Sequence, residues 1–312
     1  MEQNEVKEQS VDQSLNVKDA PVTVPSSTHK GATLSPQHTG EGGCPTCGSA
    51  KGNGTGTINY VLALGTSEPR FSSLAVEKEF AQATGRADTA GLTDREALHK
   101  VLSQRQNRYL ARQLCWVFTI EGLETYILVP RDPADLDLLL EALRPAPRPT
   151  DIDVVIGIRG PIASPAMCNG LMVPIVVFDQ MYSFDIDALI KSIPRPKEIT
   201  AKEFTPAAEE LFIRIMQMAD NAGATDEHRA VNYLAVRSSA IYATAAEAFG
   251  RNSSLTSLEV RPSPLSSARK IVEVIFSFTN RQTDVTEKFF VRVDVTEEFP
   301  FLVTKMSPYY DR

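Results

Sequence analysis

The sequence predicts an α+β protein, in which a mixed strand/helix region is followed by a helix pair packed on an antiparallel sheet. Apolar residues alternate with a period of two over 114–120, and again over 272–278 and 285–295. This period is typical of strands that bury one face. Helix starts are also visible: Thr93 is followed by Glu96, a capping-box signal, and Thr205 is followed by Pro206. Both halves of the chain therefore combine strands with helices.

The first region contains the clearest strand of the chain. Its alternation predicts two faces, one with Leu114, Trp116, Phe118 and Ile120, the other with Cys115, Val117 and Thr119. A turn at Glu121-Gly122 and a strand at 124–129 follow, which predicts a hairpin. Further strands are expected at 58–64, 154–158 and 171–178, and helices at 72–84, 93–103, 132–143 and 185–193.

The second region begins near Pro194. Thr205 as N-cap, with Pro206 at the first helical position, predicts a helix that runs to about Asp220 and ends at Gly223. A second, longer helix is expected from Thr225 to about residue 250. The two alternating stretches that follow form an antiparallel hairpin over 271–295, and 301–303 is expected to add a further strand.

These elements divide the chain into three parts. Residues 1–43 are rich in Gln, Ser, Thr, Pro and Gly, and we expect a disordered tail there, because few large apolar side chains are available to offset the entropy of ordering. Residues 44–193 form the mixed region, and residues 194–312 form the helix pair with its antiparallel sheet.

Composition narrows the class of protein. The chain has 312 residues, a formal net charge of −7 and a pI near 5.3, which disfavours a nucleic-acid partner. The start of the sequence lacks a basic segment followed by an apolar one, so no secretory signal is expected. The strongest apolar run, 171–178, is too short to span a bilayer. We therefore expect a cytoplasmic protein without a membrane partner.

The four cysteines carry the sharpest local signal. Cys44 and Cys47 form a CxxC pair next to glycine, and two thiolates at this spacing can bind one zinc ion. A structural zinc site takes four ligands, and Cys115 and Cys168 complete the set. The sequence thus predicts a structural zinc that joins the N-terminal edge of the mixed region to its strands.

Two other interpretations of the cysteines remain open. The CxxC pair can be an exposed feature of the tail, with Cys115 and Cys168 as ordinary buried thiols. The pair can also be a redox motif, although the strand–CxxC–helix context of thioredoxin-like proteins is missing.

No catalytic residues are predicted, because the sequence contains no nucleophile motif, no HExxH and no dinucleotide fingerprint. Asp179 follows an apolar strand, where some enzymes place a carboxylate, but a turn residue is the commoner reading. Asp226, Glu227 and His228 begin a helix, and acidic residues in a first turn need no catalytic explanation.

Long segments of the chain resemble a known domain. It is the domain of unknown function at the C-termini of PatA/PatG-type cyanobactin maturation proteases. The segments that carry this resemblance are 60–65 (YVLALG), 107–127 (NRYLARQLCWVFTIEGLETYI), 153–184 (DVVIGIRGPIASPAMCNGLMVPIVVFDQMYSF), 226–235 (DEHRAVNYLA) and 291–312 (VRVDVTEEFPFLVTKMSPYYDR). The resemblance covers nearly all of the chain from about Cys44 to its end.

The resemblance implies a role in making ribosomally synthesised, post-translationally modified peptides (RiPPs). The larger family proteins carry a subtilisin-like protease, but this chain has no segment for its Asp, His and Ser triad, so protease or macrocyclase activity is not carried over. We expect a non-catalytic accessory protein that binds the precursor peptide, a maturation enzyme of the pathway, or both. The sequence is also compatible with a homo-oligomer. The binding site is expected at an open edge of the 271–295 hairpin or in a groove between helices. The rival hypothesis is an unrecognised hydrolase or cyclase acting on the same peptide.

Overall fold

The computed structural model describes residues 58–310, except 88, 196, 198 and 219. The tail predicted at 1–43, together with Cys44 and Cys47, lies outside the described residues. The described part combines helices with two sheets, which confirms the α+β fold class. None of its helices is both long enough and apolar enough to cross a membrane.

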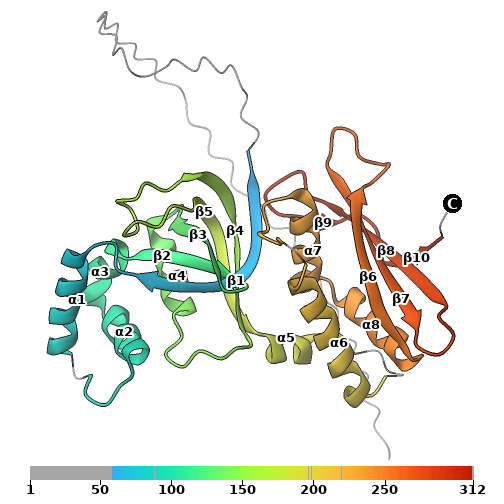
Figure 1. Ribbon diagram of the computed structural model, residues 1–312, viewed down its shortest axis with the longest axis horizontal. Helices are drawn as coiled ribbons and strands as arrows, with labels where there is room; N and C mark the ends of the chain where they lie inside the picture. The colour runs from blue at the N-terminus through green and yellow to red at the C-terminus, as the bar shows by residue number, and fades with distance from the viewer. Residues whose placement is uncertain (1–57, 88, 196, 198, 219, 311–312) are drawn as a thin grey trace, which may run out of the picture. The chain divides into compact units, whose positions relative to one another are not determined.

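Five strands of the first region close into a barrel (Figure 1). The barrel strands are β1 (Tyr60–Arg70), β2 (Cys115–Ile120), β3 (Leu123–Pro130), β4 (Asp151–Ile162) and β5 (Pro174–Asp185). They follow the order β1-β2-β3-β5-β4, in which β3 and β5 run parallel and the other pairs antiparallel. β1 closes the barrel because its first half pairs with β4 and its second half with β2.

Gly65 lies in β1 where the strand changes partner. A Cβ atom built there would stand 2.3 Å from the Thr119 carbonyl oxygen, so only glycine lets the two backbones approach this closely. The predicted β2–β3 hairpin is confirmed, with Glu121 and Gly122 both at positive φ, as a tight two-residue turn between strands requires.

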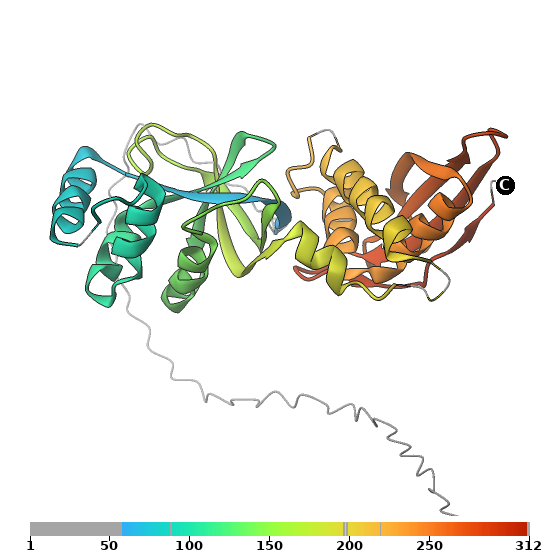
Figure 2. The ribbon, with the colours of Figure 1, turned by 90° about the horizontal axis from the view of Figure 1, so that it is seen from below.

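Four short helices pack beside the barrel strands (Figures 1 and 2). They are α1 (Leu74–Arg86), α2 (Asp94–Ser103), α3 (Arg108–Gln113) and α4 (Leu136–Ala142), with 3-10 turns at Arg105–Asn107 and Pro133–Asp135. The Thr93–Glu96 capping box at the start of α2 is confirmed, and Ser73 caps α1 at the start of the helix expected over 72–84. These caps fix where the helices begin.

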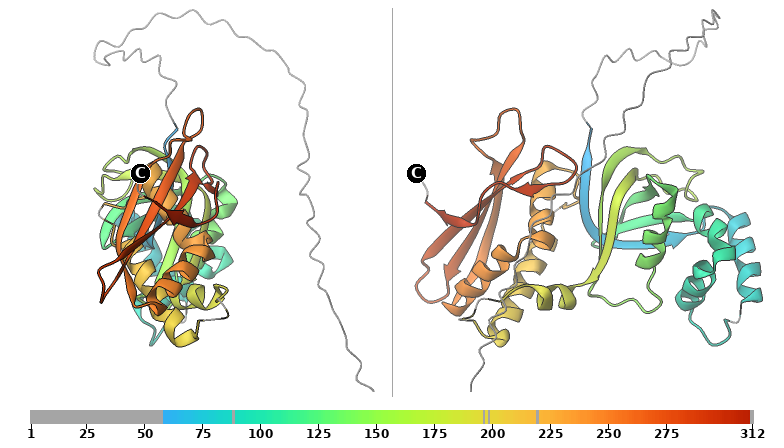
Figure 3. Two further views of the ribbon diagram at one scale, coloured as in Figure 1. Left: turned by 90° about the vertical axis from the view of Figure 1, so that its right-hand side faces the viewer. Right: turned by 180° about the vertical axis from the view of Figure 1, so that it is seen from behind.

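The second region places helices on one face of an antiparallel sheet (Figure 3). Its helices are α5 (Ile186–Ser192), α6 (Ala201–Met216), α7 (Asp226–Arg237) and α8 (Ser239–Gly250), and its strands are β6 (Ser253–Pro262), β7 (Ile271–Asn280), β8 (Thr286–Asp294), β9 (Phe301–Leu302) and β10 (Ser307–Tyr309). The sheet order is β10-β8-β7-β6, with β9 beside β8.

Alternate residues of β1 belong to two different cores. Val61 and Ala63 join the core with α1 to α4, whereas Leu62 and Leu64 join the core of α5 to α8 and the second sheet. Every one of these four side chains is at most 2% exposed. Because successive side chains of a strand point to opposite faces, β1 packs against both cores and thereby links the mixed region to the second region.

Two helix predictions for the second region are wrong. The helix predicted to start at Thr205 begins at Ala201 instead, because Thr200 and Glu203 form a capping box that the stronger Thr-Pro signal obscured. Pro206 lies inside this helix. The helix predicted from Thr225 to residue 250 is two helices, α7 and α8, because Ser238 between them has an extended backbone.

The open edge predicted for the 271–295 hairpin is also wrong. β7 is paired by β6 on one side and β8 on the other, and β8 is paired by β7 and by β10 and β9. In the described part of the chain, the edges of this sheet are β6 and β10, neither of which the sequence analysis predicted. The alternation of β6 is hard to recognise because serine, threonine and charged residues dominate it.

Candidate functional site

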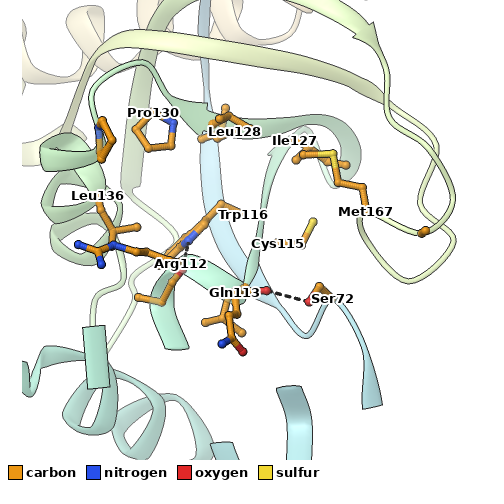
Figure 4. Close-up of a pocket in the computed structure, with 15 residues that line it drawn as sticks. Ser72, Arg112, Gln113, Cys115, Trp116, Ile127, Leu128, Pro130, Leu136 and Met167 are labelled. Atoms are coloured by element: carbon orange, nitrogen blue, oxygen red, sulfur yellow. Dashed lines mark hydrogen bonds between the residues drawn. The ribbon is translucent and has the colours of Figure 1, made fainter. Parts of the chain in front are cut away.

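An apolar groove with a volume of about 490 Å³ opens beside β2 and β3 (Figure 4). We call it the β2–β3 groove. Four parts of the chain line it: the segment before α1, the end of α3, the two strands with the start of α4, and the loop between β4 and β5. The lining residues are Ser72, Ala111, Arg112, Gln113, Leu114, Cys115, Trp116, Ile127, Leu128, Val129, Pro130, Pro133, Leu136, Ala166 and Met167.

Trp116 is the sole tryptophan of the chain and forms part of the groove. Its side chain is 3% exposed, and its indole N–H donates to the Ala111 carbonyl at 3.1 Å, so the polar end of the ring is satisfied. The Ser72 hydroxyl donates to the Gln113 carbonyl at 2.7 Å, which ties the segment before α1 to the end of α3 (Figure 4). The groove thus has an ordered apolar lining, with exposed Arg112 and Gln113 as its polar groups.

The structure brings two of the predicted zinc ligands together. Cys115, at the start of β2, and Cys168, in the loop between β4 and β5, form a disulfide with a Cα–Cα distance of 5.5 Å. They are 4% and 2% exposed, in a small core with Val117 and Ile127. This core contains the β2 face opposite to Trp116 and Phe118, as the alternation predicts.

The disulfide bears on the zinc prediction without deciding it. Zinc binds thiolates, and the two sulfurs are bonded to each other in this structure. Within the described residues, no group of three or more His, Cys, Asp or Glu side chains is placed to hold a metal ion. Since Cys44 and Cys47 lie outside these residues, the four-cysteine site stays a prediction.

A second, polar pocket of about 300 Å³ contains a buried carboxylate that the sequence analysis missed. Asp153 on β4 is 4% exposed and accepts hydrogen bonds from Ser67 on β1, through N and Oγ at 2.7 Å each, and from Ser183 on β5 at 2.5 Å. Burial raises the pKa of Asp153, and the serine hydrogen bonds oppose that rise. This network joins three barrel strands, which explains the position of Asp153 without a catalytic role.

A buried arginine joins α7 to the segment after β8. Arg229 is 2% exposed and donates to the carbonyl oxygens of Val295 at 2.8 Å and of Glu298 at 3.2 Å, and also to the Glu297 carbonyl. Its guanidinium stands 5.2 Å from the centre of the Tyr60 ring on β1. Arg229 therefore connects three distant segments, and its role is structural.

The remaining titratable cluster contains Asp179, which the sequence analysis singled out. Asp179, for which the sequence analysis favoured a turn, instead lies within β5 and is paired with Arg131 at 2.7 Å. Glu298, after β8, approaches Asp179. Burial first, and then the hydrogen bond and charge of Asp179, raise the pKa of Glu298 to about 7, while Arg131 and Arg229 oppose the rise. No local signal in the sequence links these two carboxyls, which are 119 positions apart (298 − 179).

This carboxyl pair predicts a pH-dependent stability. The pKa of Glu298 rises from 4.5 to about 7 on folding, so between these values the unfolded chain has lost a proton that the folded chain keeps. The free energy of unfolding should therefore fall as pH rises from 4.5 to 7, and level off above. Because Glu298 is only partly buried, the effect is expected on the order of 1 kcal/mol.

Chemical unfolding at several pH values measures this effect. Glu298→Gln should flatten the curve between pH 4.5 and 7, whereas Glu297→Gln, at an exposed neighbouring position, should leave it as in the unmodified chain. Parallel curves for all three proteins would contradict the assignment to Glu298.

His228, which the sequence analysis considered without predicting a catalytic role, lies in the first turn of α7. Its backbone N–H donates to the Thr225 hydroxyl at 3.1 Å, and burial lowers the pKa of its side chain. The residue lies outside the lining of the β2–β3 groove.

Comparisons with known proteins agree on one family. The family model described as "PatG Domain" matches residues 60–253, and the model described as "PatG C-terminal" matches residues 198–309. A solved structure titled "PatG Domain of Unknown Function" covers 80% of this chain and 98% of its own, with a TM-score of 0.66 and 21% identity. At that identity the likeness shows the fold. No curated protein matches the chain.

Proposed function

The chain belongs to the PatG family, a family of cyanobactin biosynthesis proteins, and we propose that it is an accessory protein that binds the precursor peptide in the β2–β3 groove. The observation that carries this proposal is the apolar lining of the groove. Its volume of about 490 Å³ falls within the range of small-ligand sites and suits one or two apolar side chains of a peptide.

The polar groups of the groove fit a peptide as well. Arg112 and Gln113 are exposed beside the apolar lining, and their side-chain N–H groups can donate to the carbonyl oxygens of an extended segment. Apolar side chains would then provide affinity through burial, and the donors would orient the backbone. We propose the maturation enzymes of the same pathway as further partners, and the cytoplasm as the site of action.

A pair of methionine variants tests the groove. Met167 lies in the groove wall, whereas Met172 is 59% exposed and lies outside the groove. Met167→Glu should weaken binding of precursor-derived peptides at least about 10-fold, or about 1.4 kcal/mol, because it brings a charge against the apolar lining. Met172→Glu should leave the affinity unchanged.

Calorimetry with overlapping synthetic peptides that span the precursor measures both affinities. Mass spectrometry of the same mixtures, with chromatography to detect isomers, checks that the peptide stays unaltered. Equal binding by both variants, or no binding by the unmodified protein, would overturn the proposal.

The rival proposal, a peptide-modifying enzyme, is favoured by one observation. Glu298, with a pKa raised to about 7, stands beside Asp179 and Arg131, and such a carboxyl pair is suited to acid–base chemistry near neutral pH. None of these residues lines the β2–β3 groove. A new peptide product that forms with this protein alone, and disappears in Glu298→Gln, would replace the accessory proposal.

We also propose that the reduced chain holds one structural zinc ion through Cys44, Cys47, Cys115 and Cys168. Cys115 and Cys168 are close enough to ligate a single ion once their disulfide is reduced, and a CxxC pair completes a tetrahedral set. Protein purified under reducing conditions should contain about one zinc per chain by elemental analysis, and Cys44→Ser/Cys47→Ser should contain none. A reduced, zinc-free chain of unchanged thermal stability would contradict this proposal.

A further inference from the structure

The loop between β4 and β5 forms one wall of the β2–β3 groove and has few attachments of its own. Ala166 and Met167 are its contributions to the groove. At the base of the loop, Ala163 N–H donates to the Val173 carbonyl at 2.9 Å. In the described structure, the other backbone hydrogen bonds of residues 164–171 remain inside the loop: Met167 to Ser164, Gly170 to Pro165 and Leu171 to Cys168. The link from the tip of this loop to β2 is therefore the Cys115–Cys168 disulfide, supported by a small apolar core.

Both cysteines border a pocket, although each is nearly buried. Cys115 lines the β2–β3 groove, and Cys168 lines another pocket of about 500 Å³, together with Phe71, Glu124 and Leu171. A small thiol that enters either pocket therefore comes to lie beside one of the two cysteines. The disulfide thus lies in a small core that has a pocket on each side, and thiol–disulfide exchange requires access to a sulfur atom.

We propose that the Cys115–Cys168 disulfide is a reducible redox site that controls the wall of the β2–β3 groove. A dithiol reductant attacks one sulfur through its thiolate, the S–S bond breaks, and a mixed disulfide forms. The second thiol of the reductant then attacks this mixed disulfide, which releases the protein with both cysteines reduced. Two electrons and two protons pass to the protein, which gains two thiols, while the reductant becomes a disulfide. Without zinc to bridge the two thiols, the loop has lost its covalent link to β2, and Trp116, which lines the same groove as Ala166 and Met167, becomes more exposed to solvent.

The redox state of this disulfide regulates the proposed peptide site, and its effect on peptide affinity rests on the proposed function. Removal of a cross-link restores conformational freedom to the closed loop. A peptide must then order the loop again when it binds, so its affinity decreases. The opening of the groove itself requires no peptide, so it can be measured independently.

The single tryptophan provides that measurement. The chain is oxidised, then reduced with dithiothreitol, with a chelator present throughout so that zinc cannot link the thiols. In Cys44→Ser/Cys47→Ser, where Cys115 and Cys168 are the cysteines left, thiol titration of the denatured chain should rise by two groups on reduction. Because Trp116 is 3% exposed in the oxidised chain, acrylamide quenching of its fluorescence is expected to increase severalfold, with an emission shift to longer wavelength, while far-ultraviolet circular dichroism stays unchanged.

Two variants assign the effect to one cysteine pair. Cys44→Ser/Cys47→Ser should respond to dithiothreitol like the unmodified chain, whereas Cys168→Ser should show the increased quenching without reductant. Unchanged quenching after complete reduction, loss of the response in Cys44→Ser/Cys47→Ser, or global unfolding on reduction would each overturn the inference. Should Cys168→Ser fail to fold, the reduction of the unmodified chain still decides. Peptide affinity is measured last: opening without any peptide binding supports the redox site and refutes only the proposed function.

Discussion

Replacement of Arg229 with methionine is expected to lower the free energy of unfolding by about 3 kcal/mol. The guanidinium is 2% exposed and donates to the carbonyl oxygens of residues 295, 297 and 298, so its removal leaves several partly buried acceptors without a donor. Its contact with the Tyr60 ring is lost as well. Because these partners lie on β1 and after β8, the effect should concern the whole fold rather than α7 alone.

Arg214→Met provides the matched control. Arg214 is exposed near the end of α6, where the same substitution should change the free energy of unfolding by no more than about 0.5 kcal/mol. Chemical denaturation of both variants measures the difference. A loss below about 1 kcal/mol for Arg229→Met would show that water replaces the guanidinium at these carbonyl groups.

Gly223→Ala is expected to cost about 3 kcal/mol or more. Gly223 has φ +69°, and a Cβ atom there would stand 2.2 Å from the Leu62 carbonyl oxygen and 2.7 Å from the Ala63 Cα. The Leu62 N–H also donates to the Gly223 carbonyl at 3.0 Å, so the added methyl group must separate two bonded backbone segments. Overpacking against backbone adds to the cost of a left-handed alanine.

Gly91→Ala separates these two contributions. Gly91 has a similar φ of +79°, but a Cβ atom there meets nothing within 4 Å. This variant should lose only about 1 kcal/mol, the cost of the backbone conformation alone. Equal losses in the two variants, measured by thermal or chemical unfolding, would mean that the loop before α7 moves away from β1 without penalty.

Gly223 was noticed in the sequence as a glycine with a structural role, but that role was assigned incorrectly. Gly223 was expected to end the helix that precedes it, but α6 ends at Met216, and the glycine instead permits close packing on β1. Only glycine fits at this position, and the sequence shows that glycine. The partner that creates the need is more than 150 positions earlier in the chain.

Features that depend on neighbouring residues were accessible from the sequence alone. The two faces of β2, the β2–β3 hairpin, the caps of α1 and α2, the α+β class and the PatG family all follow from local periodicity, capping or long similar segments. Each of these is set by interactions within a few residues along the chain, or by direct similarity. The disulfide between Cys115 and Cys168 was not predicted, because the cysteine count suggested a four-cysteine zinc site instead.

Only the tertiary structure decided which distant segments meet. Barrel closure depends on the parallel pairing of β3 with β5 and on the change of partner along β1, and neither has a local signature. The β2–β3 groove needs four separate segments, and the raised pKa of Glu298 needs a carboxyl on another element. Such pairings are selected by complementary shape, burial and charge between surfaces that exist only after folding. For that reason the sequence determined most of the elements and the family of this protein, and the fold determined its candidate site.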